Sequence, residues 1–369
     1  MRQSHLLYSQ KMFFRLFPTP QFLLMPAVGI DLSDRAARFI ELLPSGREFR
    51  IKRFGEQVLP AGIIDRGDVK DPATLRTALI ALRRDYDLSY VRVALPEEKA
   101  FLFRTEVPLL SPEETKENIS FQLEEHVPLK VGEAIFDYAV AEPLFGKISP
   151  NLREVVVSVF PRSVVEAYLD VFVGAGLSPL SFEMESTALS RAVIPEGDQG
   201  TYMIADIGEM RTGIIIVNRG TVHFTTTIDL GGGAFTDEVE KRLNVSRDEA
   251  LALKQEGAFS RHGEHRELFP TLISAINPLK EEINKHFVYW HNHPDKKDAA
   301  PPPIEKVIIC GSDAYLEGLA EHFSLSLRVK VEVANVWSNV FSTESYIPPI
   351  PFGRSLAFAT AVGLAMRSE

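Results

Sequence analysis

The sequence predicts an α/β fold made of two similar domains with a cleft between them. One layout, an apolar strand that ends in aspartate, a short loop, a second strand, a turn and a third strand, occurs at residues 28–59 and again at 203–228. Two copies of one layout in a chain indicate a duplicated domain. Strands followed by helices in both halves favour mixed sheets covered by helices. A chain of 369 residues has room for about two to three domains of ordinary size.

Composition and charge exclude several classes of protein. The formal net charge of −10 argues against a general nucleic-acid binder, because neutralising phosphates requires a basic surface. The single cysteine, Cys310, lies in an apolar run and cannot form an intramolecular disulfide, which favours a reducing compartment. No stretch approaches the roughly 20 apolar residues of a membrane-spanning helix, so we do not expect an integral membrane protein.

Residues 1–26 are interpreted as an apolar N-terminal arm. Three prolines and an arginine interrupt its apolar part at 13–26, and no small-residue cleavage site follows. An export signal is therefore not expected. The arm either packs on the body of the protein or inserts into a membrane surface as an amphipathic anchor.

In the first half, β-branched and aromatic residues predict a three-stranded meander followed by a helix and a strand. We expect the strands at 27–32, 37–43 and 48–59, the helix at 72–85 and the last strand at 91–95.

Residues 97–160 form a distinct unit with its own helix and strands. Ser111 can accept from the amides of the first turn, Pro112 suits the first helical position, and Glu114 completes a capping box. The helix is expected at 113–126, with strands at 100–107, near Asp137 and at 155–160.

The rest of the chain continues the alternation of helices and strands. We expect a helix at 163–175 and a strand at 180–183, then the second copy with strands at 202–206, 213–218 and 221–228. Helices follow at 236–243, 246–256, 272–290, 313–322 and 355–366, with strands at 306–310 and 329–333. The expected domains are a first domain at 27–96 and 161–200, an inserted subdomain at 97–160, and a second domain at 201–369.

Four loops follow strands in an order that resembles the nucleotide-binding layout of the actin/Hsp70/FtsA-like ATPases. They lie at 29–36, 204–212, 229–236 and 308–319. Any one of them is typical of a simple turn, but their shared order over residues 27–366 is specific. The resemblance implies a duplicated actin-like, ribonuclease H-like fold whose cleft binds ATP with Mg²⁺.

The resemblance implies roles for the first two loops. Asp31 and Asp206 end their strands, and each would hold the hydrated Mg²⁺ that bridges phosphates. Gly208 would let backbone amides approach a phosphate, and the Thr212 hydroxyl would donate to it. Ser33 would contact the nucleotide from the first loop.

The other two loops and a helix complete the implied nucleotide site. Gly231 and Gly232 precede a helix that Thr236 would cap, and amides at a helix start favour an anion. Lys254 would lie by the ribose. The adenine side is expected at Gly311 and Ser312.

Three residues depart from the pattern of this family. Ser33 stands where glycine is expected, Asp34 adds a charge that would repel a phosphate if it pointed inward, and Leu251 replaces a ribose-binding glutamate. No catalytic residue is assigned, and at most a weak ATPase is expected. These departures also leave open a scaffold that binds no nucleotide.

The unit at 97–160 resembles the extra subdomain of the PilM family of type IV pilus assembly proteins, because its helix is followed by Glu124-x-x-Val127-Pro128. The resemblance implies a cytoplasmic scaffold, peripheral at the inner face of the cell membrane, that serves a type IV pilus or type II secretion system. Its implied partners are the cytoplasmic N-terminal tail of a PilN-like membrane protein and other pilus assembly proteins. The alternative is an FtsA-like cell-division ATPase or a filament-forming ATPase.

The resemblance also implies a groove between the first domain and the inserted subdomain, where the tail would lie as an extended peptide. The candidates to line it are also typical of an ordinary core. They are Phe101, Phe103, Ile119, Phe121 and Leu123.

Overall fold

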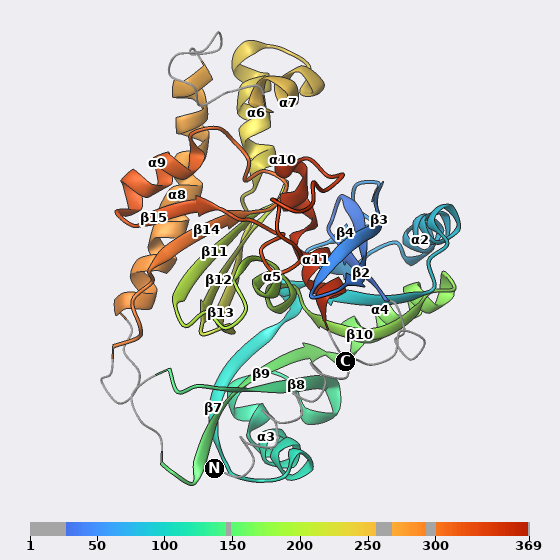
Figure 1. Ribbon diagram of the computed structural model, residues 1–369, viewed down its shortest axis with the longest axis vertical. Coiled ribbons are helices and arrows are strands. Elements are labelled where there is room, and N and C mark those ends of the chain that lie inside the picture. Colours follow the sequence, from blue (N-terminus) through green and yellow to red (C-terminus); the bar gives the residue numbers. More distant parts are fainter. Residues whose placement is uncertain (1–26, 145–148, 256–267, 293–299, 368–369) are drawn as a thin grey trace.

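The structure, a computed structural model, describes residues 27–144, 149–255, 268–292 and 300–367. The predicted N-terminal arm lies outside these ranges. The described residues form two lobes, each built on a five-stranded sheet, and a smaller inserted sheet below them in the view of Figure 1.

The first lobe has a mixed sheet with the strand order β10-β6-β1-β2-β3. β1 pairs antiparallel with β2 and parallel with β6, and it is buried along its whole length. The strands are β1 Val28–Leu32, β2 Ala36–Ser45, β3 Glu48–Val58, β6 Tyr90–Leu95 and β10 Ser178–Met184. A short hairpin, β4 Ile64–Asp65 and β5 Asp68–Val69, lies between β3 and β6 in the chain.

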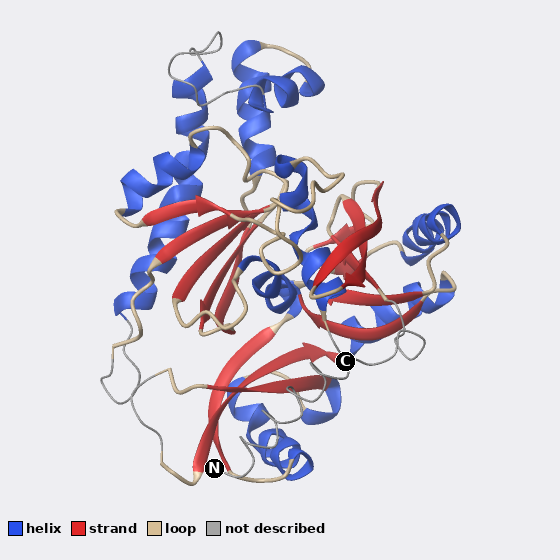
Figure 2. Cartoon of the chain, viewed as in Figure 1, coloured by secondary structure: helices blue, strands red, loops and turns tan. Residues whose placement is uncertain are grey.

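The sheet of the second lobe repeats this arrangement. Its order is β13-β12-β11-β14-β15, in which β11 pairs antiparallel with β12 and parallel with β14. The strands are β11 Thr201–Ile207, β12 Thr212–Asn218, β13 Thr221–Ile228, β14 Lys306–Cys310 and β15 Lys330–Val333. The two sheets therefore match strand for strand, which confirms the duplicated α/β fold, and Figure 2 shows helices around both.

The inserted subdomain is an antiparallel sheet in the order β7-β9-β8 with one helix packed on it. The strands are β7 Phe101–Pro108, β8 Ala134–Ala141 and β9 Leu152–Pro161, and the helix is α3 Pro112–His126. The predicted capping box is present, because the Ser111 hydroxyl accepts from the Glu114 amide and the Glu114 carboxylate accepts from the Ser111 amide.

Most helices lie where the sequence predicts them. Besides α3, the helices are α2 Pro72–Tyr86, α4 Arg162–Gly174, α5 Glu185–Val193, α6 Gly232–Leu243, α7 Arg247–Gln255, α8 Leu268–Asn292, α9 Leu319–Leu327, α10 Phe352–Ser355 and α11 Ala359–Met366. Short 3-10 turns lie at Glu97–Lys99, Val131–Glu133 and Leu356–Phe358. No helix among the described residues is long and apolar enough to cross a bilayer.

Several of these helices differ from the sequence-based expectation. The helix expected at 355–366 is divided into α10, a 3-10 turn and α11, and α8 begins four residues early, at Leu268. α6 begins four residues early, at Gly232, and α9 begins at Leu319 because Gly318, in a left-handed conformation, precedes its first turn. α5 was not predicted at all, since it is short and has no side-chain cap. It lies between the two sheets in Figure 1.

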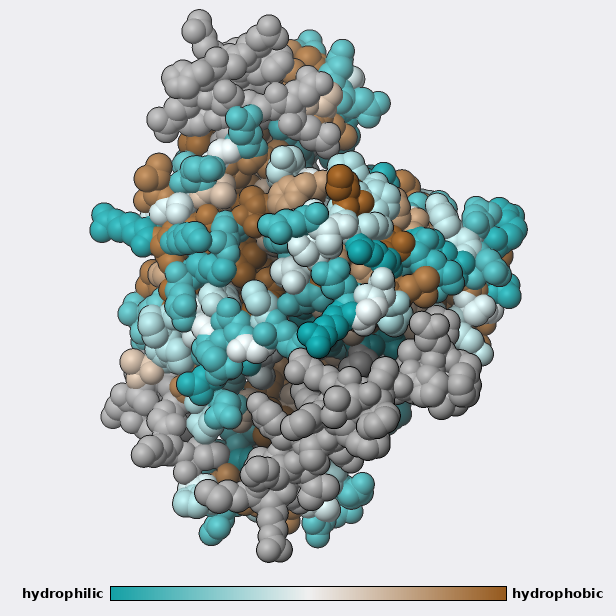
Figure 3. Space-filling view, in the orientation of Figure 1, coloured by the Kyte–Doolittle hydropathy of each residue, from teal (hydrophilic) through white to brown (hydrophobic). Residues whose placement is uncertain are grey.

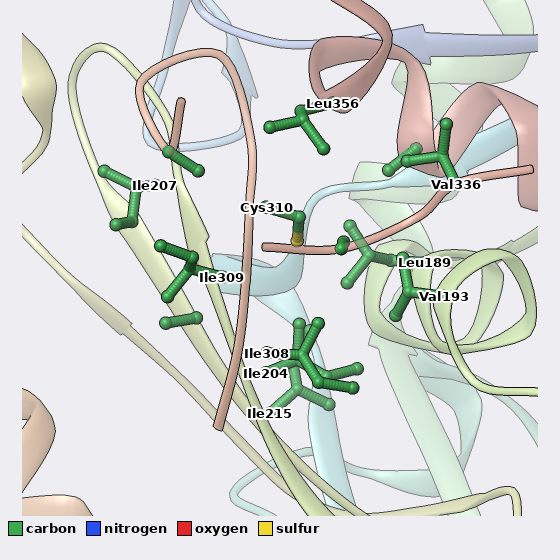
Figure 4. Packing of buried hydrophobic residues seen from close by; sticks show 14 of the residues in the cluster. Leu189, Val193, Ile204, Ile207, Ile215, Ile308, Ile309, Cys310, Val336 and Leu356 are labelled. Atoms are coloured by element: carbon green, nitrogen blue, oxygen red, sulfur yellow. The ribbon is translucent and has the colours of Figure 1, made fainter. Parts of the chain in front are cut away.

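The largest hydrophobic core joins the lobes. It contains side chains of the second sheet, of α5 and of α11, together with Ile40 and Leu42 of the first sheet. Figure 4 shows Leu189 and Val193 of α5 against this packing, with Cys310 buried among isoleucines. The single cysteine is thus part of the core, and burial raises the pKa of its thiol well above the usual range.

Helix α11 packs closely on β1 and on α5, and each of these contacts involves a glycine. A Cβ on Gly29 of β1 would come within 2.1 Å of the Ala361 carbonyl oxygen, and one on Gly363 would come within 1.7 Å of the Ala188 carbonyl oxygen. Because of this close approach, α5 and α11 pack tightly against each other between the lobes. The face in Figure 3 is mainly hydrophilic, with hydrophobic residues in small groups.

Candidate functional site

A cleft of about 310 Å³ lies between the lobes. We call it the interlobe cleft. The ends of β1 and β11 bring Asp31 and Asp206 to it, and the loop after β14 adds Gly311 and Ser312. Carboxyl ends of strands are the usual place for a ligand in α/β folds. Thr236, from the loop at 229–236, lines it as well, so the structure gathers residues from all four predicted loops in one cavity.

Three carboxyl groups meet in the cleft without enough positive charge to balance them. Burial raises the pKa of Asp31 to about 6, although Arg38 opposes the shift. Burial and then repulsion by Asp31 raise the pKa of Asp206 to about 7. Burial, with repulsion from both aspartates, also raises the pKa of Glu185 well above its usual value. A cation would relieve this repulsion.

Arg38 is a site residue that the sequence analysis missed. It lies directly opposite Asp31 in the β1–β2 pair, so both side chains project from the same face of the sheet. Its Nη2 donates to Glu56 Oε1 at 2.8 Å, whereas its buried Nε has no hydrogen-bond partner among the described residues. The predicted strand pairing could have identified it, because Arg38 stands at the register position of Asp31.

These features fit a metal-bound polyphosphate. An unsatisfied buried guanidinium N–H favours an anion, and the strand-end carboxylates favour a cation. Among the described residues, no group of three or more His, Cys, Asp or Glu side chains could cage a metal directly. A magnesium ion that keeps its waters and is shared with phosphates suits such a site.

The first loop closes on itself. The Ser33 hydroxyl accepts from the Ala36 amide at 3.1 Å and donates to the Ala36 carbonyl at 3.2 Å, so it stabilises the turn. Ser33 nevertheless lines the cleft. The neighbouring Asp34 carboxylate pairs with Arg211 of the opposite lobe rather than standing alone in the cleft.

Arg211 links the two lobes through four carboxylates. It comes from the loop between β11 and β12, and its side chain is only 14% exposed. It pairs with Asp34, with Glu98 at 3.4 Å and Asp65 at 3.5 Å, all from the first-lobe side, and with Asp229 at 3.3 Å. Because three of the four partners belong to the other side of the cleft, this network holds the lobes together.

The second loop uses part of its predicted phosphate-binding groups internally. The Gly208 amide donates to the Arg211 carbonyl at 2.9 Å and closes the hairpin. Thr212 is fully buried, and its hydroxyl donates to the Leu230 carbonyl at 2.7 Å. Gly208 lines the cleft, whereas Thr212 is not among the lining residues.

The glycine turn at the start of α6 has a packing role rather than the predicted phosphate contact. The Gly232 and Gly233 amides donate to the carbonyls of Gly208 and Glu209, each at 2.8 Å. A Cβ on Gly231 would lie 2.4 Å from the Gly208 carbonyl oxygen. The prediction that Gly232 presents its amide to an anion is wrong, because the second loop accepts from that amide, whereas the contact predicted for Gly231 stays a prediction.

Thr236 does not cap α6, which is a further correction, since the helix already begins at Gly232. Its hydroxyl lies inside the first turns and contacts the Lys254 ammonium at 2.8 Å. Lys254 also pairs with Asp313 at 2.5 Å. Leu251 lines the cleft one helical turn before Lys254 and supplies no polar group.

The five residues predicted to bind a partner do not form one surface. Ile119 and Leu123 are fully buried in the core of the inserted subdomain, which contradicts their assignment to a groove. Phe101 and Phe103 pack against the same core, and Phe103 stacks on His126 with ring centroids 4.3 Å apart. Phe121 is 83% exposed on α3.

A groove lies between the inserted subdomain and the first lobe, but none of the five predicted residues lines it. Its volume is about 1270 Å³, and we call it the subdomain groove. β8 and β10, both edge strands, line it together with the β2–β3 hairpin and residues 338–342. Its apolar lining includes Phe49, Ile135, Phe136, Tyr138, Phe160 and Phe182.

Comparisons with known proteins agree with this architecture. A family model described as type IV pilus assembly protein PilM matches residues 29–369. A solved PilM-PilN type IV pilus biogenesis complex contains a similar chain, with a TM-score of 0.72 and 21% identity over 93% of this chain and 98% of that chain.

Two further solved structures are similar at lower identity. They are the ethanolamine utilization protein EutJ from Carboxydothermus hydrogenoformans (TM-score 0.56, 18% identity, 95% of this chain and 91% of that chain) and MreB5 of Spiroplasma citri bound to ADP (0.54, 12%, 92% and 94%). The fold is therefore the actin-like α/β fold with two mixed sheets.

The raised pKa of Asp206 predicts how the stability of the ligand-free protein depends on pH. The folded protein binds an extra proton between the ordinary value of 3.8 and about 7, so the free energy of unfolding falls as the pH rises through this window. In Asp206→Asn, we expect the free energy of unfolding to fall less steeply with pH, by up to about 1.4 kcal/mol per pH unit. Denaturant unfolding from pH 4 to 8 measures it.

The matched control is Asp85→Asn, at an exposed side chain of α2. It should leave the pH dependence of the unfolding free energy unchanged. A slope that survives in Asp206→Asn would show that this carboxyl group does not titrate as described.

The Arg211 network predicts a second effect. Arg211→Ala should lower the free energy of unfolding by about 1–3 kcal/mol, since several hydrogen bonds to charged groups are lost. Hydrogen exchange should increase in the segments 33–36 and 208–212, which face each other across the cleft. Arg219→Ala, at an exposed arginine with one pair at 3.9 Å, is the control. Equal exchange in both variants would contradict a role for Arg211 in holding the lobes together.

Proposed function

This chain belongs to the family of the type IV pilus assembly protein PilM, and we propose that it is a cytoplasmic scaffold that binds Mg·ATP in the interlobe cleft. We also propose that its subdomain groove takes the cytoplasmic N-terminal tail of a PilN-like inner-membrane protein. This tail would bring the chain to the inner face of the membrane, where it would meet other assembly proteins of a pilus or type II secretion system.

The unbalanced charge of the interlobe cleft is the observation that carries the nucleotide proposal. In this proposal Asp31 and Asp206 hold a hydrated Mg²⁺, and Arg38 Nε, which has no hydrogen-bond partner among the described residues, donates to a phosphate oxygen. Bound Mg·ATP would supply both the cation and the anion that these groups lack. The MreB5 structure, which is similar in fold, is bound to ADP.

Hydrolysis is at most weak in this proposal. The Ser33 hydroxyl forms hydrogen bonds within its own turn. The Asp34 carboxylate and the Arg211 guanidinium pair with each other instead of contacting a ligand. These internal partners favour one rival, a scaffold that binds no nucleotide. An FtsA-like division or filament-forming ATPase is the other rival, and the match of the PilM family model over residues 29–369 disfavours it.

The subdomain groove supports the peptide proposal by its position and lining. An extended peptide can add to an edge strand through main-chain hydrogen bonds while its side chains enter apolar pockets. β8 and β10 are edge strands, and aromatic side chains lie along the groove between them. Arg191 and Arg367 both pair with Glu183 in its lining, so the rim is polar. The solved relative is a complex of PilM with PilN.

Mg·ATP titration by calorimetry tests the nucleotide proposal. We expect saturable binding to the unchanged protein, no measurable binding to Asp206→Ala, and about tenfold weaker binding to Arg38→Met because a charge-assisted hydrogen bond is lost. Arg84→Met, at a residue 74% exposed on α2, should bind like the unchanged protein. Absence of binding by the unchanged protein at millimolar nucleotide would favour the scaffold without nucleotide.

A bulky residue in the subdomain groove tests the peptide proposal. Ala139 is exposed on β8 and lines the groove, so Ala139→Trp should fill it and weaken binding of a labelled peptide from the cytoplasmic N-terminus of the PilN-like partner at least tenfold. Val173→Trp, on the exposed side of α4 and not among the lining residues, is the control. If fluorescence anisotropy gives equal affinities for both variants, the peptide binds elsewhere.

A further inference from the structure

Lys254 uses its full donor capacity within the protein. Its side chain is only 3% exposed, and its ammonium contacts the Gly232 carbonyl at 3.1 Å, the Thr236 hydroxyl at 2.8 Å and Asp313 Oδ1 at 2.5 Å. An ammonium group carries three N–H donors. The three contacts therefore occupy all of them, although Lys254 lines the interlobe cleft.

Asp313 is the one exchangeable partner of the three. Gly232 and Thr236 belong to α6 and are buried, whereas Asp313 lies on the loop between β14 and α9 and is only partly buried. Thr236 and Asp313 both line the cleft. The Asp313 amide donates to the Ile207 carbonyl at 3.0 Å, so a main-chain contact that does not involve Lys254 helps to position this loop. The other carboxylate oxygen, Oδ2, accepts from the Ser312 hydroxyl at 3.0 Å.

The Asp313 carboxylate already fills the space beside the start of α6. A Cβ on Gly232 would lie 2.1 Å from Asp313 Cγ, so only glycine allows this contact. The start of a helix favours a negative charge. The lining of the cleft contains eight acidic and five basic side chains, so Asp313 adds to an excess of negative charge that a polyphosphate would meet.

We propose that Asp313 is an internal competitor of the nucleotide for Lys254. In the nucleotide-free protein, Asp313 holds the ammonium. Binding exchanges this carboxylate for an oxygen of the nucleotide, so Asp313 sets the affinity of the cleft and keeps it low. The inference rests on the proposed binding of Mg·ATP, and it assigns Asp313 a function that the predicted motif residues do not include.

Asp313→Asn is the variant that isolates the charge. It keeps the size of the side chain and an oxygen that can accept from Lys254, but the hydrogen bond loses its charge assistance. Mg·ATP should therefore bind about tenfold more tightly to this variant than to the unchanged protein. Glu317→Gln removes an exposed carboxylate from the same loop and should leave the affinity unchanged.

The experiment is a calorimetric titration of Mg·ATP into the full chain and four variants: Asp313→Asn, Glu317→Gln, Lys254→Met and the double variant Asp313→Asn with Lys254→Met. We expect the tighter binding of Asp313→Asn to disappear in the Lys254→Met background. A gain that persists there would mean that Asp313 acts only through general repulsion, and this would overturn the competition for Lys254. Thermal unfolding of each variant confirms that it is folded.

The outcomes separate this inference from the proposed function. If the unchanged protein binds Mg·ATP and Asp313→Asn binds equally or more weakly, the inference fails and the nucleotide proposal stands. If Asp313→Asn binds and the unchanged protein does not, the competition is supported directly. If neither protein nor any variant binds at millimolar nucleotide, both proposals fail.

Discussion

Asp31 and Asp206 stand at the ends of equivalent strands in two matching sheets, and the duplication therefore brings two negative charges into one cleft. The packing of α5 and α11 keeps the lobes close enough for these charges to repel each other. Buried like charges are costly unless a counter-charge is present. Arg38, the register partner of Asp31, supplies only part of it.

The other charged groups of the cleft satisfy one another. Arg211 is surrounded by four carboxylates, and Lys254 by three acceptors that include Asp313. Each of these two cations could serve a bound anion only by giving up an internal partner. The cleft therefore combines two aspartates that lack a full counter-charge with two cations, Arg211 and Lys254, that already pair with groups of the protein. This combination is suited to a scaffold that responds to a nucleotide and turns it over slowly.

Local patterns predicted most of the fold. The apolar strands around Asp31 and Asp206 and the capping box at Ser111 depend on neighbouring residues, and each lies where the sequence indicates. α5 escaped prediction because it is short and has no side-chain cap, and packing between the lobes stabilises it. The register that would have identified Arg38 follows from strand pairing, not from a motif.

The predicted site was less complete, because its errors concern contacts between distant segments. Gly231 and Gly232 carry the spacing of an anion-binding turn, but the second loop packs closely on Gly231 and accepts from the Gly232 amide. Thr212 faces Leu230 rather than the cleft, and Ile119 and Leu123 face the core of the inserted subdomain. Nothing in the local sequence indicates which of two faces such a residue presents.

Proton release on binding tests the central claim most directly. Mg·ATP would be titrated near pH 6.5 in several buffers that differ in ionisation enthalpy. If the carboxylates of Asp31 and Asp206 must ionise to hold the cation, binding releases about one proton, and the observed enthalpy changes linearly with the ionisation enthalpy of the buffer. Binding with the same enthalpy in every buffer would contradict the account, because the nucleotide would then be held without the two aspartates.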